Sequence, residues 1–256
     1  MERFKLTYHL IIGILKNKSD VLVLIGEYNK ALQELDKVYL VADIVQHQMG
    51  EVGLIEKSEI HISRCWIYKT KGQMDKAANE GEIGLKIIDD LEFFVNKELL
   101  QNLSAVPQVG TIKNRLNLIK ATGFNNLGII FYDKGEYDEA FEFFQKYLEI
   151  AQKIEDKKTI GIAANNLGLI YDAKGEYDKA IELYQESITL SEEVGNKPMI
   201  GLTNNNLGYI YQMMGHCDKA IEHYLKYLRT SEEIGQKLGI ALASSNLGGS
   251  FLEISG

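Results

Sequence analysis

The sequence has only two prolines in 256 residues and no stretch in which apolar and polar residues alternate. Because proline interrupts helices and alternation marks half-buried strands, these two absences predict an all-α fold. The hydrophobic content of 45% provides ample material for helix packing. No apolar run reaches the roughly 20 residues that a membrane-spanning helix requires.

Cysteine and runs of positive charge are also scarce. Cys65 and Cys217 form no spacing typical of a metal or redox site, so we expect reduced packing residues and a cytoplasmic location. Residues 6–15 are apolar enough to be compared with a signal peptide, but Tyr8 and His9 interrupt them and no cleavage site of small residues follows. The formal net charge of −8 argues against a nucleic-acid partner, whose phosphates require a basic surface.

The sequence also lacks a catalytic or cofactor-binding arrangement. Its five histidines form no HExxH pair, and its glycines recur with a structural period instead of forming a phosphate-binding loop. Acidic pairs such as Glu192 with Glu193 recur with the same period, which is typical of a solvated helix face. We therefore predict no enzyme activity, no metal and no cofactor. A hydrolase or transferase that uses unrecognised acidic residues is the least favoured alternative.

What the sequence does contain is an internal repeat. The stretch NNLGLIYDAKGEYDKAIELY at 165–184 recurs in similar form at 125–144 and at 205–224, so the period is 40. Between residues 161–200 and residues 201–240, twenty of the forty positions are identical. Such a period indicates an array of similar units, each of which packs on its neighbours.

Each unit is predicted to consist of two helices. In the first helix Leu167 and Tyr171 lie on one apolar face, and Gly175 is expected to end it in a left-handed conformation. Gly168 and Ala180 are expected where the two helices cross, because larger side chains would push the pair apart. The second helix also has one apolar face, which comprises Tyr177, Ala180, Ile181, Tyr184 and Ile188.

These residues resemble the tetratricopeptide repeat family over residues 121–256. The family pattern has Leu-Gly and an aromatic residue in the first helix, then aromatic, Ala and aromatic in the second. One unit matches it at Leu127, Gly128, Phe131, Tyr137, Ala140 and Phe144, and another at Leu207, Gly208, Tyr211, Ala220 and Tyr224, with Cys217 in place of an aromatic residue. The period of 40 is similar to that of kinesin light chains, spindle-orientation adaptors and the sensory arrays of bacterial signalling proteins. The resemblance implies a right-handed superhelical solenoid of antiparallel helix pairs.

The signature of the turn and second helix also occurs farther upstream. GEYNKA at 26–31 and GQMDKA at 72–77 match GEYDEA at 135–140. The spacings between the five turns of the chain are therefore 46, 63, 40 and 40. We predict divergent helix pairs of the same type over residues 1–113 and a regular array over residues 114–256, which ends in a lone first helix.

The uneven spacings predict two irregular regions. The spacing of 46 favours a longer loop at residues 50–53. The spacing of 63 exceeds the period of 40 by 23 residues, and we expect this insertion within residues 91–113. There, residues 91–103 are expected to extend a helix, whereas Pro107 and Gly110 predict a loop.

The family resemblance further implies a concave groove lined by the first helices. In the family, the positions two before, one before and two after the Leu face this groove. In this sequence these positions are Asn125, Asn126, Ile129, Asn165, Asn166, Leu169, Asn205, Asn206, Tyr209, Ser245, Asn246 and Gly249, and the same register places Trp66 on the groove. An asparagine carboxamide both donates and accepts hydrogen bonds, which suits an extended peptide backbone. The alternative is that these asparagines cap or brace adjacent helices.

We therefore expect an interaction scaffold or regulatory input module that binds a protein or peptide segment in this groove, with neither nucleic acid nor membrane as partner. One alternative is a sensor of a short signalling peptide within a larger bacterial regulator. Another is a self-associating scaffold, in which the ends of the array or residues 91–113 pair two chains. Because residues 241–254 repeat a first helix with Leu247, Gly248 and Phe251 in register and no second helix follows, we expect the chain to be the amino-terminal part of a longer protein.

Overall fold

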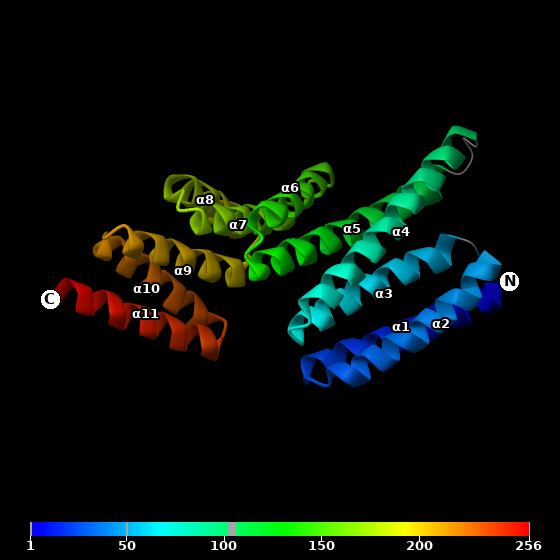
Figure 1. The fold of residues 1–256 in the computed structure, drawn as a ribbon, viewed down its shortest axis with the longest axis horizontal. Helices are drawn as coiled ribbons and strands as arrows, with labels where there is room; N and C mark the ends of the chain where they lie inside the picture. The colour runs from blue at the N-terminus through cyan, green and yellow to red at the C-terminus, as the bar shows by residue number, and fades with distance from the viewer. Residues whose placement is uncertain (1, 50, 102–105, 256) are drawn as a thin grey trace. The chain divides into compact units, whose positions relative to one another are not determined.

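The computed structural model describes residues 2–49, 51–101 and 106–255, and over these ranges it consists of eleven helices and no strand (Figure 1). The chain divides into two compact units, Met1–Glu136 and Tyr137–Gly256. The predicted all-α fold of adjacent helix pairs is therefore confirmed. The superhelical path stays a prediction. None of the described helices combines the length and the apolar character that crossing a bilayer requires.

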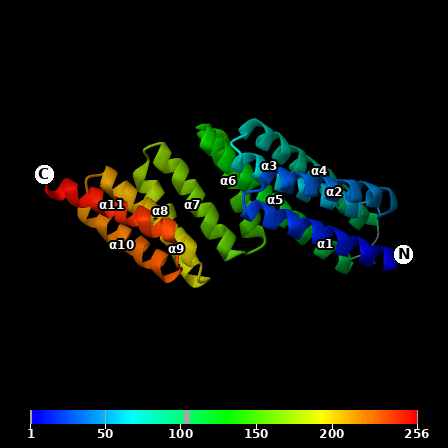
Figure 2. The same ribbon diagram turned by 90° about the horizontal axis from the view of Figure 1, so that it is seen from below.

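The first unit contains five helices that lie side by side in chain order (Figures 1 and 2). They are α1 (Glu2–Leu24), α2 (Tyr28–Met49), α3 (Glu51–Thr70), α4 (Met74–Gln101) and α5 (Val106–Lys134). In addition to its contacts with α2 and α4, α3 packs against α5. Apolar side chains such as Ile12, Leu35, Val38 and Ile60 form one core cluster of this unit.

The second unit contains six helices, of which the first five each have 17 residues. They are α6 (Tyr137–Lys153), α7 (Lys157–Ala173), α8 (Tyr177–Glu193), α9 (Lys197–Met213), α10 (Cys217–Glu233) and α11 (Lys237–Ser255). Consecutive helices pack together, and α7 also contacts α9. Ala180, Tyr184, Leu207 and Ile210 form a buried cluster that joins α8 to α9. We refer to α1, α3, α5, α7, α9 and α11 as the first helices.

The turn between the two helices of a pair has the predicted form. Gly175 has a φ of 73°, which is the left-handed region that glycine adopts without strain. Its backbone N–H donates to Asp172 O at 2.9 Å, and the N–H of Glu176 donates to Tyr171 O at 2.9 Å. These two bonds satisfy carbonyl groups at the end of α7, so the turn ends one helix and places the next beside it.

The helices of a pair cross at the small residues that the sequence marked. A Cβ atom added to Gly168 would lie 2.6 Å from Cε1 of Tyr184, whose ring is fully buried. Gly208 stands in the same relation to Tyr224 in the next repeat. The alanine of the turn signature is fully buried in all five occurrences, at Ala31, Ala77, Ala140, Ala180 and Ala220. Each of the five turn signatures in the sequence therefore places a small, buried residue near the start of the second helix of a pair.

The described part of the insertion within residues 91–113 is helical, and residues 102–105 of it lie outside the described residues. As expected, α4 continues through the first part of it, to Gln101. The predicted loop at Pro107 and Gly110 is wrong, because α5 begins at Val106 and includes both residues. Proline is tolerated in a first helical turn, where its missing N–H would have no partner, and one glycine costs a helix only about 1 kcal/mol.

The predicted longer loop at residues 50–53 is also wrong for residues 51–53, which are helical, whereas residue 50 lies outside the described residues. α2 ends at Met49 and α3 begins at Glu51, so the spacing of 46 arises from helices of 22 and 20 residues. Gly53 is a buried residue of α3, and a Cβ atom there would lie 2.6 Å from the carbonyl oxygen of Ala42 in α2. This glycine permits close helix packing and does not form a turn.

Replacing Gly168 by alanine tests the crossing. We expect Gly168→Ala to lower the free energy of unfolding by about 1–2 kcal/mol, because overpacking against the Tyr184 ring outweighs the higher helix propensity of alanine. Gly248 occupies the same repeat position, but no heavy atom lies within 4 Å of the place that its Cβ atom would occupy, so Gly248→Ala is the matched control and should be neutral or stabilising. Urea denaturation followed by far-UV circular dichroism measures both. Equal effects of the two changes would contradict the steric account.

Candidate functional site

One candidate site is a pocket of about 570 Å³ between α1, α3 and α5 in the first unit. Four residues predicted to face the groove lie together in it, namely Trp66, Asn125, Asn126 and Ile129. The other lining residues are Ser19, Asp20, Val23, Leu24, Ile62, Ser63, Ile67 and Thr122. The sequence register thus predicted the α3 and α5 walls of the pocket. It missed the α1 wall, because the repeat signature is weak in the first helix of the chain.

Helical spacing explains why these side chains meet. On α3, Ser63 lies three residues before Trp66, and on α5, Thr122 lies three and seven residues before Asn125 and Ile129. Residues three, four and seven apart share one face of a helix. Since α3 packs against α5, these two faces form adjoining walls. A single face of α3 and a single face of α5 therefore contribute to the pocket.

The pocket combines apolar walls with a few polar groups. The side chain of Trp66 is 42% exposed and that of Leu24 is 85% exposed, so both present apolar surface to a ligand. The Nζ atom of Lys69 lies 5.3 Å from the Trp66 ring centre and pairs with Asp133 at 3.1 Å. Asn126 is largely buried at the side of the pocket. Apolar surface beside amide groups is suited to a peptide, which combines apolar side chains with a polar backbone.

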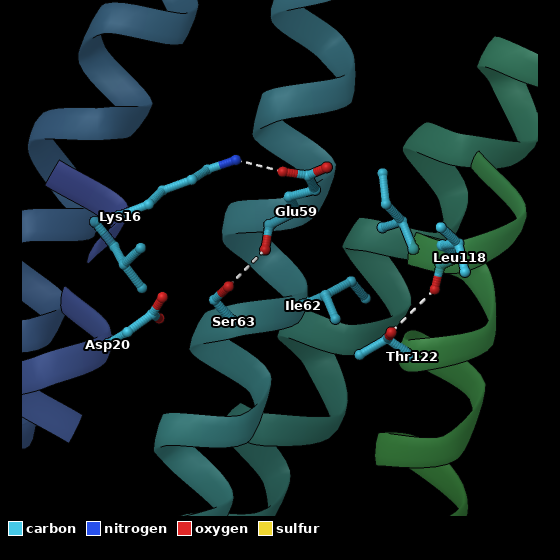
Figure 3. A pocket seen from close by; sticks show the side chains of 9 residues that line it. Lys16, Asp20, Glu59, Ile62, Ser63, Leu118 and Thr122 are labelled. Atoms are coloured by element: carbon cyan, nitrogen blue, oxygen red, sulfur yellow. Dashed lines mark hydrogen bonds and ion pairs between the residues drawn. The ribbon is translucent and has the colours of Figure 1, made fainter. Parts of the chain in front are cut away.

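A second pocket of about 300 Å³ continues the first (Figure 3). The two share four lining residues, Asp20, Ile62, Ser63 and Thr122. We call the combined depression the α1–α3–α5 groove. Its second part is lined by Lys16 of α1 and Glu59 of α3, which are joined by an ion pair.

A network of four charged side chains ties the three helices together at this end of the groove. Lys16 of α1 pairs with both Glu56 and Glu59 of α3. Arg115 of α5 donates from Nη2 to Glu56 at 2.7 Å and from Nε to Glu59 at 2.7 Å. Two cations therefore face two carboxylates, and their charges balance. The network fixes the spacing of the groove walls.

The network also favours the charged forms of Glu59 and Arg115. Burial disfavours the charge on Glu59, but hydrogen bonds and attraction from Arg115 and Lys16 outweigh it and hold the pKa of Glu59 below its usual value. Burial likewise opposes the charge on Arg115, but the two glutamates raise the pKa of this guanidinium above its usual value. Both groups are thus charged at neutral pH.

The asparagines of the second unit bond to one another across the first helices. Asn165 Oδ1 of α7 accepts hydrogen bonds from Asn206 Nδ2 and Thr203 Oγ1 of α9, each at 3.1 Å. In the next repeat, Asn246 Nδ2 of α11 donates to Asn205 Oδ1 of α9 at 2.8 Å. These bonds support the bracing alternative for the four asparagines involved. Contact of the asparagines with a ligand stays a prediction.

We call these hydrogen bonds between first helices the asparagine brace. Thr203 belongs to it, although the sequence did not predict this residue. Its hydroxyl lies 3.3 Å from Ser187 Oγ of α8, and both side chains are buried. The resulting network connects α7, α8 and α9 at one point. The sequence offered one signal for it, a polar residue at a position that is Ala163 in the preceding repeat.

The second unit has an exposed apolar stripe on α9. Leu202, Tyr209 and Met213 are exposed and lie seven and four residues apart, on one face of the helix. Of these, the sequence predicted Tyr209, which is 49% exposed. Asn205 and Asn206 lie between Leu202 and Tyr209 and are half-buried, as is Leu169 of α7. The stripe thus adjoins the asparagine brace.

Asp172 of α7 is an acidic side chain of this unit whose pKa is strongly changed by its surroundings. Burial raises its pKa to about 6. The corresponding residue of the next repeat is Gln212, a neutral side chain whose Oε1 accepts a hydrogen bond from Tyr224 Oη at 3.0 Å. A neutral group therefore suits this position better than a carboxylate.

The side chains that could bind a metal or attack a substrate are dispersed. Over the part of the chain that the structure describes, no three His, Cys, Asp or Glu side chains are arranged to hold a metal ion. Cys65 is buried, and burial together with the nearby Glu80 raises the pKa of its thiol to about 12. Cys65 therefore packs in the core as a thiol of low reactivity.

Comparison with known proteins identifies the repeat. The family model described as tetratricopeptide repeat matches residues 120–193. The resemblance inferred from the sequence is thereby confirmed over these residues, whereas its extension to residue 256 and the long-repeat subtype stay predictions. A search of curated protein sequences found no match.

Several solved structures share the fold. BtubC from P. vanneervenii has a TM-score of 0.66 at 15% identity, over 89% of this chain and 84% of that one. Aspartyl phosphate phosphatase F from Bacillus subtilis has a TM-score of 0.71 at 17% identity, over 99% and 60%. A Rap protein complexed with Competence and Sporulation Factor has a TM-score of 0.70 at 16% identity, over 94% and 63%. This chain thus spans less than two thirds of the latter two proteins, and at these identities the likeness is one of fold alone.

Substitution of Asn165 measures the strength of the brace. We expect Asn165→Ala to lower the free energy of unfolding by about 1–3 kcal/mol, because the buried hydroxyl of Thr203 and the half-buried amide of Asn206 lose their acceptor. Ser245 occupies the corresponding position of the last repeat and is exposed, so Ser245→Ala should change stability by less than about 0.5 kcal/mol. Chemical denaturation provides the comparison. An unaltered stability of Asn165→Ala would show that the amide does not brace the helices.

Replacing Asp172 tests the effect of pH on stability. Because the pKa of Asp172 is raised from its ordinary value of 3.8 to about 6 in the folded state, its contribution to stability is present below about pH 4 and is lost as pH rises through 6. With allowance for screening by solvent, Asp172→Asn should be more stable than the wild type by about 1–2 kcal/mol above pH 6, with no advantage near pH 4. Asp178→Asn, at an exposed carboxylate, controls for the change in net charge. Denaturation curves across this pH range would refute the assignment if the difference were constant.

Proposed function

We propose that the chain is an interaction module that binds an extended peptide or protein segment on the exposed faces of its first helices, since residues 120–193 match the tetratricopeptide repeat family model. The role is one of binding, without catalysis. The ligand lies in the α1–α3–α5 groove of the first unit, and the stripe of Leu202, Tyr209 and Met213 is a contact surface of the second. The proposal applies to each unit separately.

The observation that carries the proposal is the composition of the α1–α3–α5 groove. Its larger pocket has a volume of about 570 Å³, within the range of roughly 300–1,000 Å³ that is typical of ligand sites. Trp66 and Leu24 offer exposed apolar surface, and Trp66 is an aromatic residue of the kind that dominates binding energy at interfaces. Asn125 and Asn126 lie in the same pocket, so amide groups stand beside the apolar wall.

The charged network explains why this groove is ready to bind. Lys16, Glu56, Glu59 and Arg115 link α1, α3 and α5 through ion pairs within the chain itself. A site whose walls are already positioned loses less conformational entropy on binding than one that must order itself. The groove therefore offers a ligand a fixed spacing between its apolar and polar parts.

A sensor of a short signalling peptide is the alternative within the same class. The Rap protein in the comparison was solved in complex with Competence and Sporulation Factor, and it shares the fold of this chain. A sensor would use the same groove but would bind a free peptide of a few residues instead of a segment within a protein. The length of the shortest peptide that binds with full affinity separates the two.

A self-associating scaffold is the second candidate function, and one feature of α1 favours it. Leu10, Ile14 and Val21 are exposed and lie four and seven residues apart on one face of this helix. An apolar stripe of this kind is a common basis for helix pairing. Self-association would appear as a doubled mass in light scattering, independently of any peptide.

The peptide-binding proposal is tested by introducing charge into the groove wall. Peptides are first selected from a phage-displayed library with the wild-type chain, and their affinities are measured by fluorescence anisotropy. We expect Leu24→Glu to weaken the selected peptides at least about tenfold, since a buried, unpaired carboxylate would cost more than about 1.4 kcal/mol.

Leu40→Glu is the matched control. Leu40 of α2 is 62% exposed but does not line the groove, so this change introduces the same charge in the same unit without touching the site. Trp66 is the single tryptophan of the chain, and its emission should shift when a peptide binds. Equal affinities of the two variants, or an unchanged Trp66 emission with a bound peptide, would place the binding site elsewhere.

A further inference from the structure

The α1–α3–α5 groove has one acidic side chain whose charge is not balanced. Asp20 of α1 lines both pockets of the groove and therefore lies where they join. Among the described residues, Asp20 takes part in no ion pair, and its side chain forms no hydrogen bond with them. Figure 3 shows it on the side of α1 that faces Ser63 of α3.

The other charges around the groove compensate one another. Lys16 and Arg115 are paired with Glu56 and Glu59 at one end. At the opposite end, Lys69 beside Trp66 is paired with Asp133, which lies outside the lining residues. The hydroxyls of Ser63 and Thr122 donate to backbone carbonyls of their own helices. The centre of the groove is thus acidic, and the acidity comes from Asp20.

The charged side chains of the groove lie toward one end, where Leu118 and Ile119 also contribute apolar surface. Trp66, Ile129 and Leu24 line the larger pocket only, whereas Lys16 and Glu59 line the smaller pocket only. A ligand that follows the groove therefore passes from apolar surface to the carboxylate of Asp20. This order of surfaces determines which side chains the ligand needs.

On these observations, and resting on the proposed function, we propose that the groove selects a peptide segment that carries a large apolar side chain and, beside it along the segment, a lysine or arginine. The apolar side chain occupies the pocket beside Trp66, where it loses contact with water. The basic side chain pairs with Asp20, the carboxylate of the groove that has no partner among the described residues. A segment with an acidic side chain at that place is disfavoured by repulsion.

The test uses a positional-scanning library of hexapeptides with acetylated amino termini and amidated carboxyl termini, so that only side chains carry charge. Binding of each peptide pool to the complete chain is followed by the emission of Trp66. Four variants accompany the wild type: Asp20→Asn, Asp20→Lys, and the controls Asp90→Asn and Asp90→Lys. Asp90 is an exposed residue of α4 that does not line the groove. Because Asp20 is exposed as well, all four variants should fold, and circular dichroism confirms that they do.

We expect the wild type to prefer pools with Lys or Arg at one position and Phe, Leu or Met at another. Asp20→Asn should reduce the preference for the basic residue about threefold, the scale of an exposed ion pair, and added salt should reduce it in the wild type. Asp20→Lys should reverse the preference in favour of Asp and Glu. The Asp90 variants should behave as the wild type does.

Two results would overturn the inference in distinguishable ways. If peptides bind at Trp66 without a preference for basic residues, or if the Asp90 variants alter that preference as much as the Asp20 variants do, the selectivity assigned to Asp20 is wrong and the proposed function remains. If no pool changes the emission of Trp66, the groove is not a peptide site, and the proposed function fails there together with the inference.

Discussion

The structure depends on the close crossing of two helices within each pair. Where Gly168 meets the ring of Tyr184, the absence of a side chain lets a large aromatic residue fill the interface completely. The neighbouring Ala180 is fully buried for the same reason. Small and large residues thus alternate across the contact, which gives dense packing without strain. A repeated sequence then produces a repeated contact, and each unit needs no central core.

This mode of packing leaves one face of each first helix available. The second helix of the pair covers one side and the neighbouring first helices cover the flanks, as the contacts of α3 with α5 and of α7 with α9 show. The remaining faces carry Trp66 and Leu24 in the first unit and Tyr209 in the second, all of which are exposed. In the first unit, ion pairs between Lys16, Arg115 and the glutamates of α3 hold the walls apart. Binding surface is thus a consequence of how the repeats stack.

The sequence was a good guide where local rules decide and a poor one where helix packing overrides them. It located the turns, where a positive φ requires glycine, and the crossing point at Gly168, where a side chain would clash with Tyr184. It failed at Pro107 and Gly53, which it assigned to loops. A proline in a first turn costs a helix little, and a helical glycine becomes favourable when a neighbouring backbone approaches, as a carbonyl group of α2 does at Gly53. The candidate site shows the same division, since the register predicted Trp66 but gave no indication of Asp20.

By itself, the sequence determined the all-α class, the helix pairs and the turns, together with the tetratricopeptide repeat pattern that the family model matches over residues 120–193, because these follow from periodicity and from glycine and alanine at fixed positions. Only the tertiary structure decided how polar residues of the same register are used. Asn165 and Asn206 bond to each other across α7 and α9, whereas Asn125 lines a pocket in the first unit. It also decided that Lys16 is paired and that Asp20, among the described residues, is not. The physical reason is that a hydrogen bond or an ion pair depends on the distance between atoms of different helices, and a one-dimensional pattern specifies the face of a helix but not its neighbour.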